Sequence, residues 1–477
     1  MKLRVQEGDI HLTNLKTRMP FKYGIATMTR MPMAFVRVAL EMDGRTVFGV
    51  SSDLLPPKWF TKIPDSDVDA EVHEMLAVIA RALEVSIGIE GESPFEIWQE
   101  LYETQDIWSE SDDVPPLLAH FGTSMVERAV IDAFCRGMGD SLYRLLFADK
   151  LGVDLGAVHP ILHGKTPADL LSTSPRRTAI ARHTVGLADP ITSGDISDAE
   201  RLGDGLPQAL DECIDRYGLK HFKIKISNNF ETDSARLKAI ADLLVEKCPP
   251  DYAFTLDGNE CFKTCRDFEE YWKRLIAIDG LGEFWEHLIF VEQPIHRDNA
   301  LDAQEHSFND WPNRPPIIID ESDSSISALP LALKLGYCGT SHKNCKGVFK
   351  GIANACLLAH HRNENPDQRF LMSGEDLCNV GPVALLQDLA VCAAIGVESV
   401  ERNGHHYNAG LSQFPEELQE QIIKGHGDLY QRSDAGWPTL SIRDGEINLA
   451  SINESAFGVR FLLDTSQFTP AAQWQWP

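Results

Sequence analysis

The stretch HFKIKIS, residues 221–227, indicates a buried β-strand that carries two lysines. A phenylalanine and two isoleucines alternate with Lys223 and Lys225, so both ammonium groups project from the same face of the strand. Lysine is rarely buried without a partner. We therefore expect the rest of the chain to place negative charge opposite Lys223 and Lys225.

Short apolar runs of the same kind recur from about residue 180 onward, and each ends in polar or charged residues. Their ends follow one another at intervals of 23 to 35 residues, with helical stretches between them. The runs are HTVGLAD, HFKIKIS, AFTLDGNE, LIFVEQPI, PIIIDES, GTSHKNC, RFLMSGED and ESVERNGHH. A βα unit takes about 30 residues, so eight strands in series predict a TIM-type (β/α) barrel. The alternative is an open doubly wound sheet, which would need a glycine-rich phosphate loop that the sequence does not show.

The segments that flank the barrel predict a second domain. Residues 1–60 predict antiparallel strands with a hairpin at Asp43-Gly44, and residues 68–150 predict helices. The later stretch GWPTLSIRDGEINL predicts a hairpin-like pair around Asp444-Gly445 that returns to the N-terminal sheet.

These patterns divide the chain into three parts, joined by a segment at 150–182 that is long for a simple link. We expect an N-terminal α+β capping domain at 1–155, a catalytic barrel at 180–410, and a C-terminal segment at 411–477 that returns to the capping domain.

Composition and charge limit the partners and the compartment. The net charge is −27 and the pI is about 4.9, which argues against binding to nucleic acid or to an anionic membrane surface. The first residues lack the apolar core of a signal peptide, and no apolar run reaches the roughly 18 residues of a membrane span. Ten cysteines without CxxC spacing indicate reduced thiols. We expect a cytoplasmic protein that forms a homo-oligomer.

Three consecutive strands of the predicted barrel end in carboxylates, namely Asp257, Glu292 and Asp320. The carboxyl ends of barrel strands converge at one mouth, where these acids would repel one another unless a cation lies among them. Hard oxygen ligands suit Mg²⁺, with Mn²⁺ as a substitute. The next strand ends in Lys343, across the mouth from the lysine pair.

The chain resembles the enolase superfamily over nearly its whole length, and within it the muconate-lactonizing and dipeptide-epimerase subgroup. The motif MPFKYGIATMTRMP, residues 19–32, is similar to the mobile capping loop of that family. The resemblance implies a modified (β/α)7β barrel with an α+β capping domain. The residues that carry it are Lys223-Ile224-Lys225 on strand two, the metal ligands Asp257, Glu292 and Asp320 on strands three to five, and Lys343 on strand six.

Two subgroups of the family fit less well. The mandelate-racemase subgroup has a histidine on strand seven, where this chain has MSGEDLCN. Dipeptide epimerases have an Asp-x-Asp on strand eight, where this chain has ERNGHH.

The predicted function is a Mg²⁺-dependent enzyme that removes the α-proton of a small carboxylic acid and forms a metal-stabilised enolate. Lys225 is the predicted base, Lys223 is the neighbour that lowers its pKa, and Lys343 acts from the opposite face. Racemisation or epimerisation, cycloisomerisation and dehydration all remain open, so the enzyme is an isomerase or a lyase. The alternatives are a non-catalytic metal-binding protein of the same fold and an unrelated metal-dependent barrel lyase.

Further residues are candidates for contact with the substrate. Alternation along the strand predicts that Glu321 points away from the metal that Asp320 binds. The candidates are Asn259 in the D-x-N motif, Glu321, the capping-loop residues Tyr23, Lys58 and Trp59, and Glu375, Glu401 and His405 near the last two strands.

Overall fold

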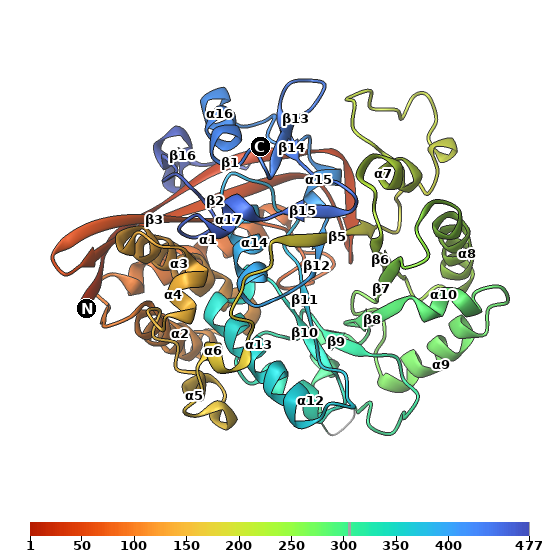
Figure 1. Cartoon of the computed structure of the whole chain (residues 1–477), viewed down its shortest axis with the longest axis horizontal. Coiled ribbons are helices and arrows are strands. Elements are labelled where there is room, and N and C mark those ends of the chain that lie inside the picture. Colours follow the sequence, from red (N-terminus) through yellow and green to blue (C-terminus); the bar gives the residue numbers. More distant parts are fainter. Residues whose placement is uncertain (304–306, 477) are drawn as a thin grey trace.

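Eight parallel strands form a closed barrel in the computed structural model, which describes residues 1–303 and 307–476 (Figure 1). Each strand pairs with the next along the chain, and the last pairs with the first. The strands are β5 (Thr178–Val185), β6 (His221–Lys225), β7 (Ala253–Asp257), β8 (Leu288–Glu292), β9 (Ile317–Ile319), β10 (Gly339–His342), β11 (Leu371–Gly374) and β12 (Ser399–Arg402). The predicted barrel is therefore confirmed.

Helices connect successive strands and cover the outside of the barrel. They are α7 (Leu210–Tyr217), α8 (Phe230–Lys247), α9 (Cys265–Ile276), α10 (Gly282–Glu286), α11 (Arg297–Ala300), α12 (Ala328–Lys334), α13 (Val348–Glu364) and α14 (Ala384–Ala394). Local sequence sets where they begin. The Asn229 side chain caps α8 by accepting a hydrogen bond from the Thr232 amide, at 3.1 Å. Seven strand-helix connections and a final strand make a (β/α)7β barrel.

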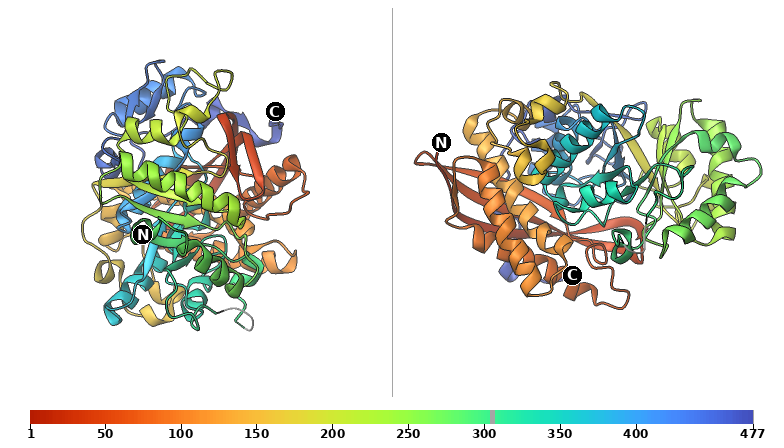
Figure 2. Two further views of the ribbon diagram at one scale, coloured as in Figure 1. Left: turned by 90° about the vertical axis from the view of Figure 1, so that its right-hand side faces the viewer. Right: turned by 90° about the horizontal axis from the view of Figure 1, so that it is seen from below.

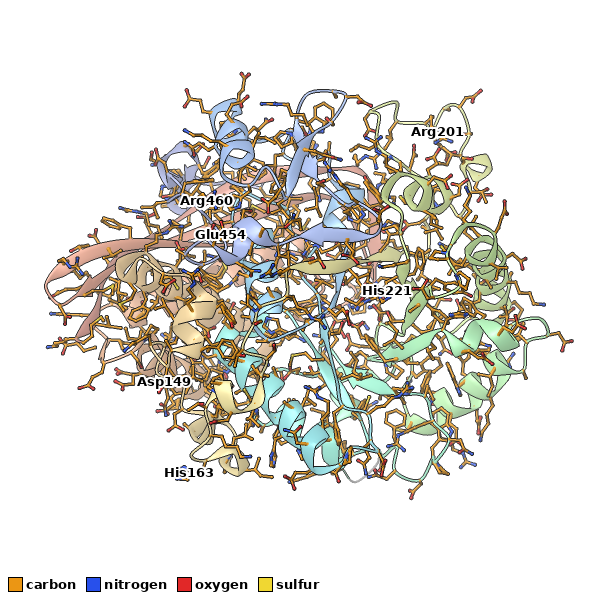
Figure 3. All side chains as sticks on the ribbon, in the orientation of Figure 1. Asp149, His163, Arg201, His221, Glu454 and Arg460 are labelled. Atoms are coloured by element: carbon orange, nitrogen blue, oxygen red, sulfur yellow. The ribbon has the colours of Figure 1, made fainter. Side chains whose placement is uncertain are left out.

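The barrel strands are buried on both faces, which explains their continuous apolar character. In β6, Phe222 and Ile224 are fully buried against the surrounding helices, and Lys223 and Lys225 are buried inside the barrel. His221 starts β6 (Figure 3), and its Nδ1 lies 2.9 Å from the Ser399 hydroxyl, at the start of β12. The lysines therefore lie at the opposite, carboxyl end of the strands.

A five-stranded antiparallel sheet and four helices form the cap. The sheet strands are β1 (Leu3–Tyr23), β2 (Ala26–Met42), β3 (Arg45–Leu54), β4 (Glu90–Gly91) and β16 (Thr469–Pro470). The helices are α1 (Val68–Ser86), α2 (Pro94–Ser111), α3 (Pro116–Met138) and α4 (Leu142–Phe147). Asp43 and Gly44 have φ angles of 49° and 81°, as a type I′ hairpin turn requires, so the predicted hairpin is present.

The C-terminal region differs from the expected hairpin. A tight turn forms at Asp444-Gly445, but β14 (Pro438–Leu440) pairs with β13 (Tyr430–Arg432), and β15 (Glu446–Asn448) pairs with β5 of the barrel. The chain returns to the N-terminal sheet further on, where β16 pairs with β1. The helices of this region are α15 (Gly404–Tyr407), α16 (Glu416–Gly425) and α17 (Ala450–Asn453).

The segment at 150–182 crosses from the cap to the first barrel strand along α13. It contains α5 (Leu155–Val158) and α6 (Pro167–Leu170), and both helices contact α13. His159 Nε2 lies 2.9 Å from the Asn354 side-chain oxygen of α13. All ten cysteines are free thiols. Within residues 1–303 and 307–476, none of the helices combines the length and the apolar character needed to cross a membrane.

Buried polar contacts attach the cap to the barrel. Glu127 of α3 accepts hydrogen bonds from the amides of Val348 and Phe349, at 3.0 and 2.7 Å, and thereby caps α13 of the barrel. The cap lies at the end of the molecule opposite α8, α9 and α10 (Figures 1 and 2). The barrel helices α13 and α14 are thus covered by the cap, which explains why α14 is buried throughout and α13 is buried from Val348 to Ala359.

Arg128 provides a test of the buried polar contacts within the cap. Its guanidinium donates to Asp53 and to the Ser52 carbonyl, each at 2.9 Å, and the Arg128–Asp53 pair is almost completely buried. We expect Arg128→Met to lower the free energy of unfolding by about 3–5 kcal/mol, because it leaves the Asp53 carboxylate buried without its cation. Urea unfolding measures the change.

The matched control is Arg144→Met in α4, which removes an exposed ion pair with Asp140. This change should cost less than about 0.5 kcal/mol. If Arg128→Met and Arg144→Met unfold at the same urea concentration, the buried Arg128–Asp53 pair does not stabilise the cap.

Candidate active site

Lys223 lies at the centre of a buried group of carboxylates. Its Nζ is 2.8 Å from Glu375, 3.0 Å from Glu292, 3.1 Å from Asp257 and 3.5 Å from Glu401. These acids come from β7, β8, β12 and the residue that follows β11. Burial disfavours the ammonium form, but Asp257 and Glu292 outweigh this effect and raise the pKa of Lys223 well above its ordinary value.

Lys225 shares one of these carboxylates with Lys223. Its Nζ lies 3.3 Å from Asp257 Oδ2 and donates to the Asn259 side-chain oxygen at 2.7 Å. Asn259 in turn donates its backbone amide to Asp257, at 2.8 Å. The D-x-N motif therefore fixes both the carboxylate and the lysine.

Lys343 approaches from the other side of the carboxylates. Its ammonium group pairs with Asp320 and lies 3.1 Å from Glu375 Oε2. The Trp59 ring of the cap lies over it, with 5.1 Å from the nitrogen to the ring centroid. Burial lowers the pKa of Lys343. The Asp320 and Glu375 carboxylates have a larger, opposite effect, so the pKa of Lys343 is well above its ordinary value.

The predicted metal ligands are brought together in part. Ligand oxygens of Glu292, Asp320 and Glu375 all lie within 4.8 Å of one another, whereas Asp257 is not a member of this trio. Asp257 is linked to Glu292 through Lys223 instead. Glu375, which the sequence indicated only as a substrate contact, thus belongs to the carboxylate group itself.

The donor set fits a hard divalent cation such as Mg²⁺, because it consists of carboxylate oxygens. Glu292 Oε2 is buried and makes no hydrogen bond to the described residues, although the Lys223 ammonium lies 3.0 Å away. Burial and the neighbouring Glu375 carboxylate raise the pKa of Glu292 well above its ordinary value. Positive charge near Glu292 is therefore insufficient, as expected at a site that receives a cation.

The three lysines open into a cavity between the barrel and the cap, and Glu292 is not among the residues that line it. Six of the eight predicted substrate contacts line it, together with Lys223, Lys225, Lys343, Asp257 and Asp320. The six are Tyr23, Lys58, Trp59, Asn259, Glu321 and Glu401. Glu375 lies behind the cavity wall, where it pairs with Lys223 and Lys343.

Glu321 does not point away from the site as expected. It lines the same cavity as Asp320, and its Oε2 is buried without a hydrogen bond to the described residues. Strand β9 ends at Ile319, so the alternation of a strand no longer applies at Asp320 and Glu321. Burial and the adjacent Asp320 and Glu260 carboxylates raise the pKa of Glu321 to about 8.

His405 is the predicted contact that lies elsewhere. It is not among the residues that line the cavity, and its ring packs against His183 and Tyr217. The short helix α15 begins just before it and carries its side chain toward β5 and α7 instead of toward the mouth. The stretch at 19–32 also differs from the expected loop, since it is the tip of the β1–β2 hairpin, where Tyr23 and Gly24 reach the cavity.

Comparison with known proteins supports the architecture. No family model matches the chain, and no curated protein matches its sequence. Solved structures do match over nearly the whole chain. A mandelate racemase/muconate lactonizing protein from Herpetosiphon aurantiacus is 14% identical with a TM-score of 0.60, and the match covers 95% of this chain and 98% of that one. This chain has the enolase-superfamily fold.

Two further structures have the same fold. A dipeptide epimerase from Enterococcus faecalis, in complex with Mg and a dipeptide, is 16% identical with a TM-score of 0.57, covering 93% of this chain and 100% of that one. A 2-chloromuconate cycloisomerase from Rhodococcus opacus is 17% identical with a TM-score of 0.57, and the match covers 93% of this chain and 94% of that one. At these identities the likeness confirms the predicted fold, and the chemistry must be argued from the site.

A clamp that was not predicted from the sequence joins the two parts of this enolase-superfamily fold. Arg297, at the start of α11, forms two bonds of 2.7 Å to the Glu260 carboxylate. The same guanidinium donates to the carbonyls of Phe60 and Trp59 in the cap, at 2.7 and 2.9 Å. Lys62 of the cap donates to Glu260 at 3.2 Å. Arg297 therefore holds the segment that places Trp59 over Lys343.

Two more basic residues of the site were missed. Lys346 donates to Asp320 at 3.0 Å, and Arg182 of β5 donates to Glu375 at 3.1 Å. Lys346 follows Lys343 by three residues in the same motif, SHKNCKG, so the motif itself contained the signal. Arg182 lies inside a strand, and only the closure of β5 onto β12 brings it near Glu375.

The contacts of Arg297 predict how often residues 56–62, the lid that carries Trp59, open. Arg297→Gln removes the charged donor to the Trp59 and Phe60 carbonyls, so residues 56–62 should open more often. We expect their amide hydrogens to exchange about 10- to 100-fold faster, as measured by mass spectrometry.

The control is Arg314→Gln, because Arg314 donates to the carbonyls of Gly336 and Trp311 far along the chain from this segment. Unchanged exchange at 56–62 in Arg297→Gln would show that the guanidinium does not hold the lid.

Proposed function

We propose that this chain is an enolase-superfamily enzyme that uses Mg²⁺, or Mn²⁺ in its place, to remove the α-proton of a small carboxylic acid. The observation that carries the proposal is the placement of Lys225 and Lys343 in one cavity, on either side of buried carboxylates. Asp257, Glu292 and Asp320 are the proposed metal ligands. A bound Mg²⁺ would hold the substrate carboxylate and neutralise the negative charge that develops next to it.

The two lysines divide the proton transfer between them. Lys225, held by Asn259 and Asp257, is the proposed base on one face of the substrate. Lys343 lies on the other face, where it returns a proton, stabilises negative charge as a cation, or acts as base for the other enantiomer. Lys223 remains within the carboxylate group as a fixed positive charge.

The barrel and the cap contribute different parts of the proposed active site. The barrel, residues 180–410, supplies the charged groups, and the cap, residues 1–155, covers them. Trp59, Tyr23 and Gly24 close the cavity above the lysines and exclude water, which strengthens electrostatic interactions inside it. Specificity then depends on the cap residues that line the cavity and on Glu321 and Glu401 of the barrel.

The neighbouring structures favour an isomerase over a lyase. They include an epimerase bound to Mg and a dipeptide and a cycloisomerase. A further neighbour, an enolase from Bradyrhizobium, is bound to magnesium and mandelic acid and does not bear on this choice. Each of these ligands contains a carboxylate. We therefore propose racemisation, epimerisation or cycloisomerisation of a small acid as the reaction.

Hydrogen exchange with solvent tests the proposal before the product is known. The protein is incubated in D₂O with Mg²⁺ and a panel of sugar acids, hydroxy acids and N-acylated amino acids, and deuterium at the α-carbon is measured by NMR. We expect incorporation into at least one class of acid. A protein that binds these acids without exchanging any α-proton would be the non-catalytic alternative.

Variants of the two lysines then assign their roles. For a racemase or epimerase, Lys225→Ala should lower exchange from one enantiomer by about 10²- to 10⁴-fold, and Lys343→Ala should do the same for the other. For a dehydratase, one variant should lose exchange while the other retains it and stalls later. Lys220→Ala is the control, because Lys220 pairs with Glu446 outside the site. Full exchange in both active-site variants would rule out either lysine as the base.

A further inference from the structure

A second group of ligating side chains lies where the barrel closes, apart from the carboxylates. His183 belongs to β5, Cys213 to α7, and His405 and His406 to α15 just after β12. His183, Cys213 and His406 each offer a ligand atom within 4.8 Å of the others, and all three are buried. This His/Cys group therefore joins strand one, strand eight and the helix between strands one and two.

One distance within the group of His183, Cys213 and His406 matches that of a tetrahedral metal site. Cys213 Sγ lies 3.5 Å from His406 Nδ1. Zinc with its usual bond lengths to sulfur and nitrogen separates tetrahedral ligands by about 3.6 Å for an S–N pair. His405 is not a member of this trio and contacts it through His183, whose Nδ1 lies 3.2 Å from His405 Nε2.

The surroundings favour neutral imidazoles, which are the form that binds a metal. Within the described residues, no hydrogen bond or ion pair joins His183, His405 or His406 to a carboxylate, and burial alone disfavours a charged ring. His405 Nδ1 is buried without a hydrogen-bond partner in the described part of the chain.

Positive charge close to the His/Cys group is partly neutralised. Arg18 of β1 donates to the His406 carbonyl at 2.9 Å, and the same guanidinium forms two bonds to Asp204, at 2.7 and 2.9 Å. Asp204 therefore offsets part of the repulsion that the Arg18 guanidinium exerts on a cation bound by His183, Cys213 and His406.

We propose that His183, Cys213 and His406 form a second metal centre that takes a borderline-soft divalent ion such as Zn²⁺. Nitrogen and sulfur ligands select Zn²⁺, whereas the carboxylate centre selects Mg²⁺, so the two centres are chemically distinct. Binding requires the Cys213 thiol to release its proton to solvent, and no redox step is involved. The three ligands are buried at the barrel seam and do not line the active-site cavity, so the proposed ion is structural.

The proposed ion would stabilise the seam of the barrel and, through it, the β1–β2 hairpin at the cavity. Arg402 of β12 pairs with His183 of β5 at this seam. Tyr407, the next residue after His406, stacks on Phe21 of the β1–β2 hairpin with 4.1 Å between ring centroids. Phe21 lines the cavity, so an ion bound at the His/Cys group would fix one wall of the active site without touching the substrate.

Cobalt substitution tests the proposal directly. The full-length protein is stripped of metal and titrated with Co²⁺ in excess Mg²⁺, which keeps the carboxylate centre filled. We expect a stoichiometric charge-transfer band from cysteine thiolate to Co²⁺ in the near ultraviolet, displaced by Zn²⁺. Zn²⁺ should also raise the melting temperature.

Matched cysteine variants identify the ligand. Cys213→Ala should lose both the band and the Zn²⁺-dependent rise in melting temperature, whereas Cys356→Ala, which removes a buried thiol from α13, should keep both. Glu292→Gln should also keep the band, because it changes only the carboxylate centre. If wild type and Cys213→Ala respond to Co²⁺ and Zn²⁺ identically, the His/Cys group is a hydrogen-bonded cluster and the proposal is wrong.

Discussion

The contact of Lys223 with four buried carboxylates is the interaction on which the rest of the site depends. Burying several charges in one place costs free energy unless each is paired and held in place. The acids come from four separate barrel strands or their ends, so the pairing exists only when the barrel is closed. Closing the barrel and assembling the charged site are therefore one event, and the strand that carries Lys223 and Lys225 is central to both.

The cap completes the charged site from above. Glu127 caps the barrel helix α13, and the Arg297–Glu260 pair of the barrel holds the backbone of Trp59 and Phe60. Water is thereby kept from Lys343, whose nitrogen faces the Trp59 ring. This arrangement explains why the cap and the barrel share buried polar contacts on two sides of the molecule, and why lid residues and catalytic lysines meet in one cavity.

Much of the fold and of the charged site could be predicted from the sequence, because apolar runs indicate barrel strands and the polar residues that end them converge at one mouth. The spacing of apolar runs predicted the eight barrel strands, and the Asp43-Gly44 turn predicted the cap hairpin. The position of Glu321 was predicted wrongly because β9 ends two residues before it, and strand ends are set by tertiary contacts. The Asp444-Gly445 turn was predicted correctly, but the strands on either side pair with β13 and β5, and a turn motif carries no information about such partners.

Residues whose partners are distant in the sequence were hardest to predict. Arg297 binds carbonyl groups of a segment more than two hundred residues away, and Arg182 reaches Glu375 across the barrel seam. His405 was predicted to face the substrate, yet α15 directs it toward β5. The local sequence pattern shows that each of these residues is charged or polar. Its contact partner is known only once the barrel has closed.

Anomalous diffraction from a crystal grown with Mn²⁺ shows whether the carboxylates around Lys223 and Lys343 hold a divalent cation. We expect one strong anomalous peak at the mouth of the barrel, coordinated by oxygens of Asp257, Glu292 and Asp320. A peak bound by Glu292, Asp320 and Glu375 without Asp257 would overturn the ligand assignment. No peak at the mouth at saturating Mn²⁺ would show that these carboxylates are not a metal site.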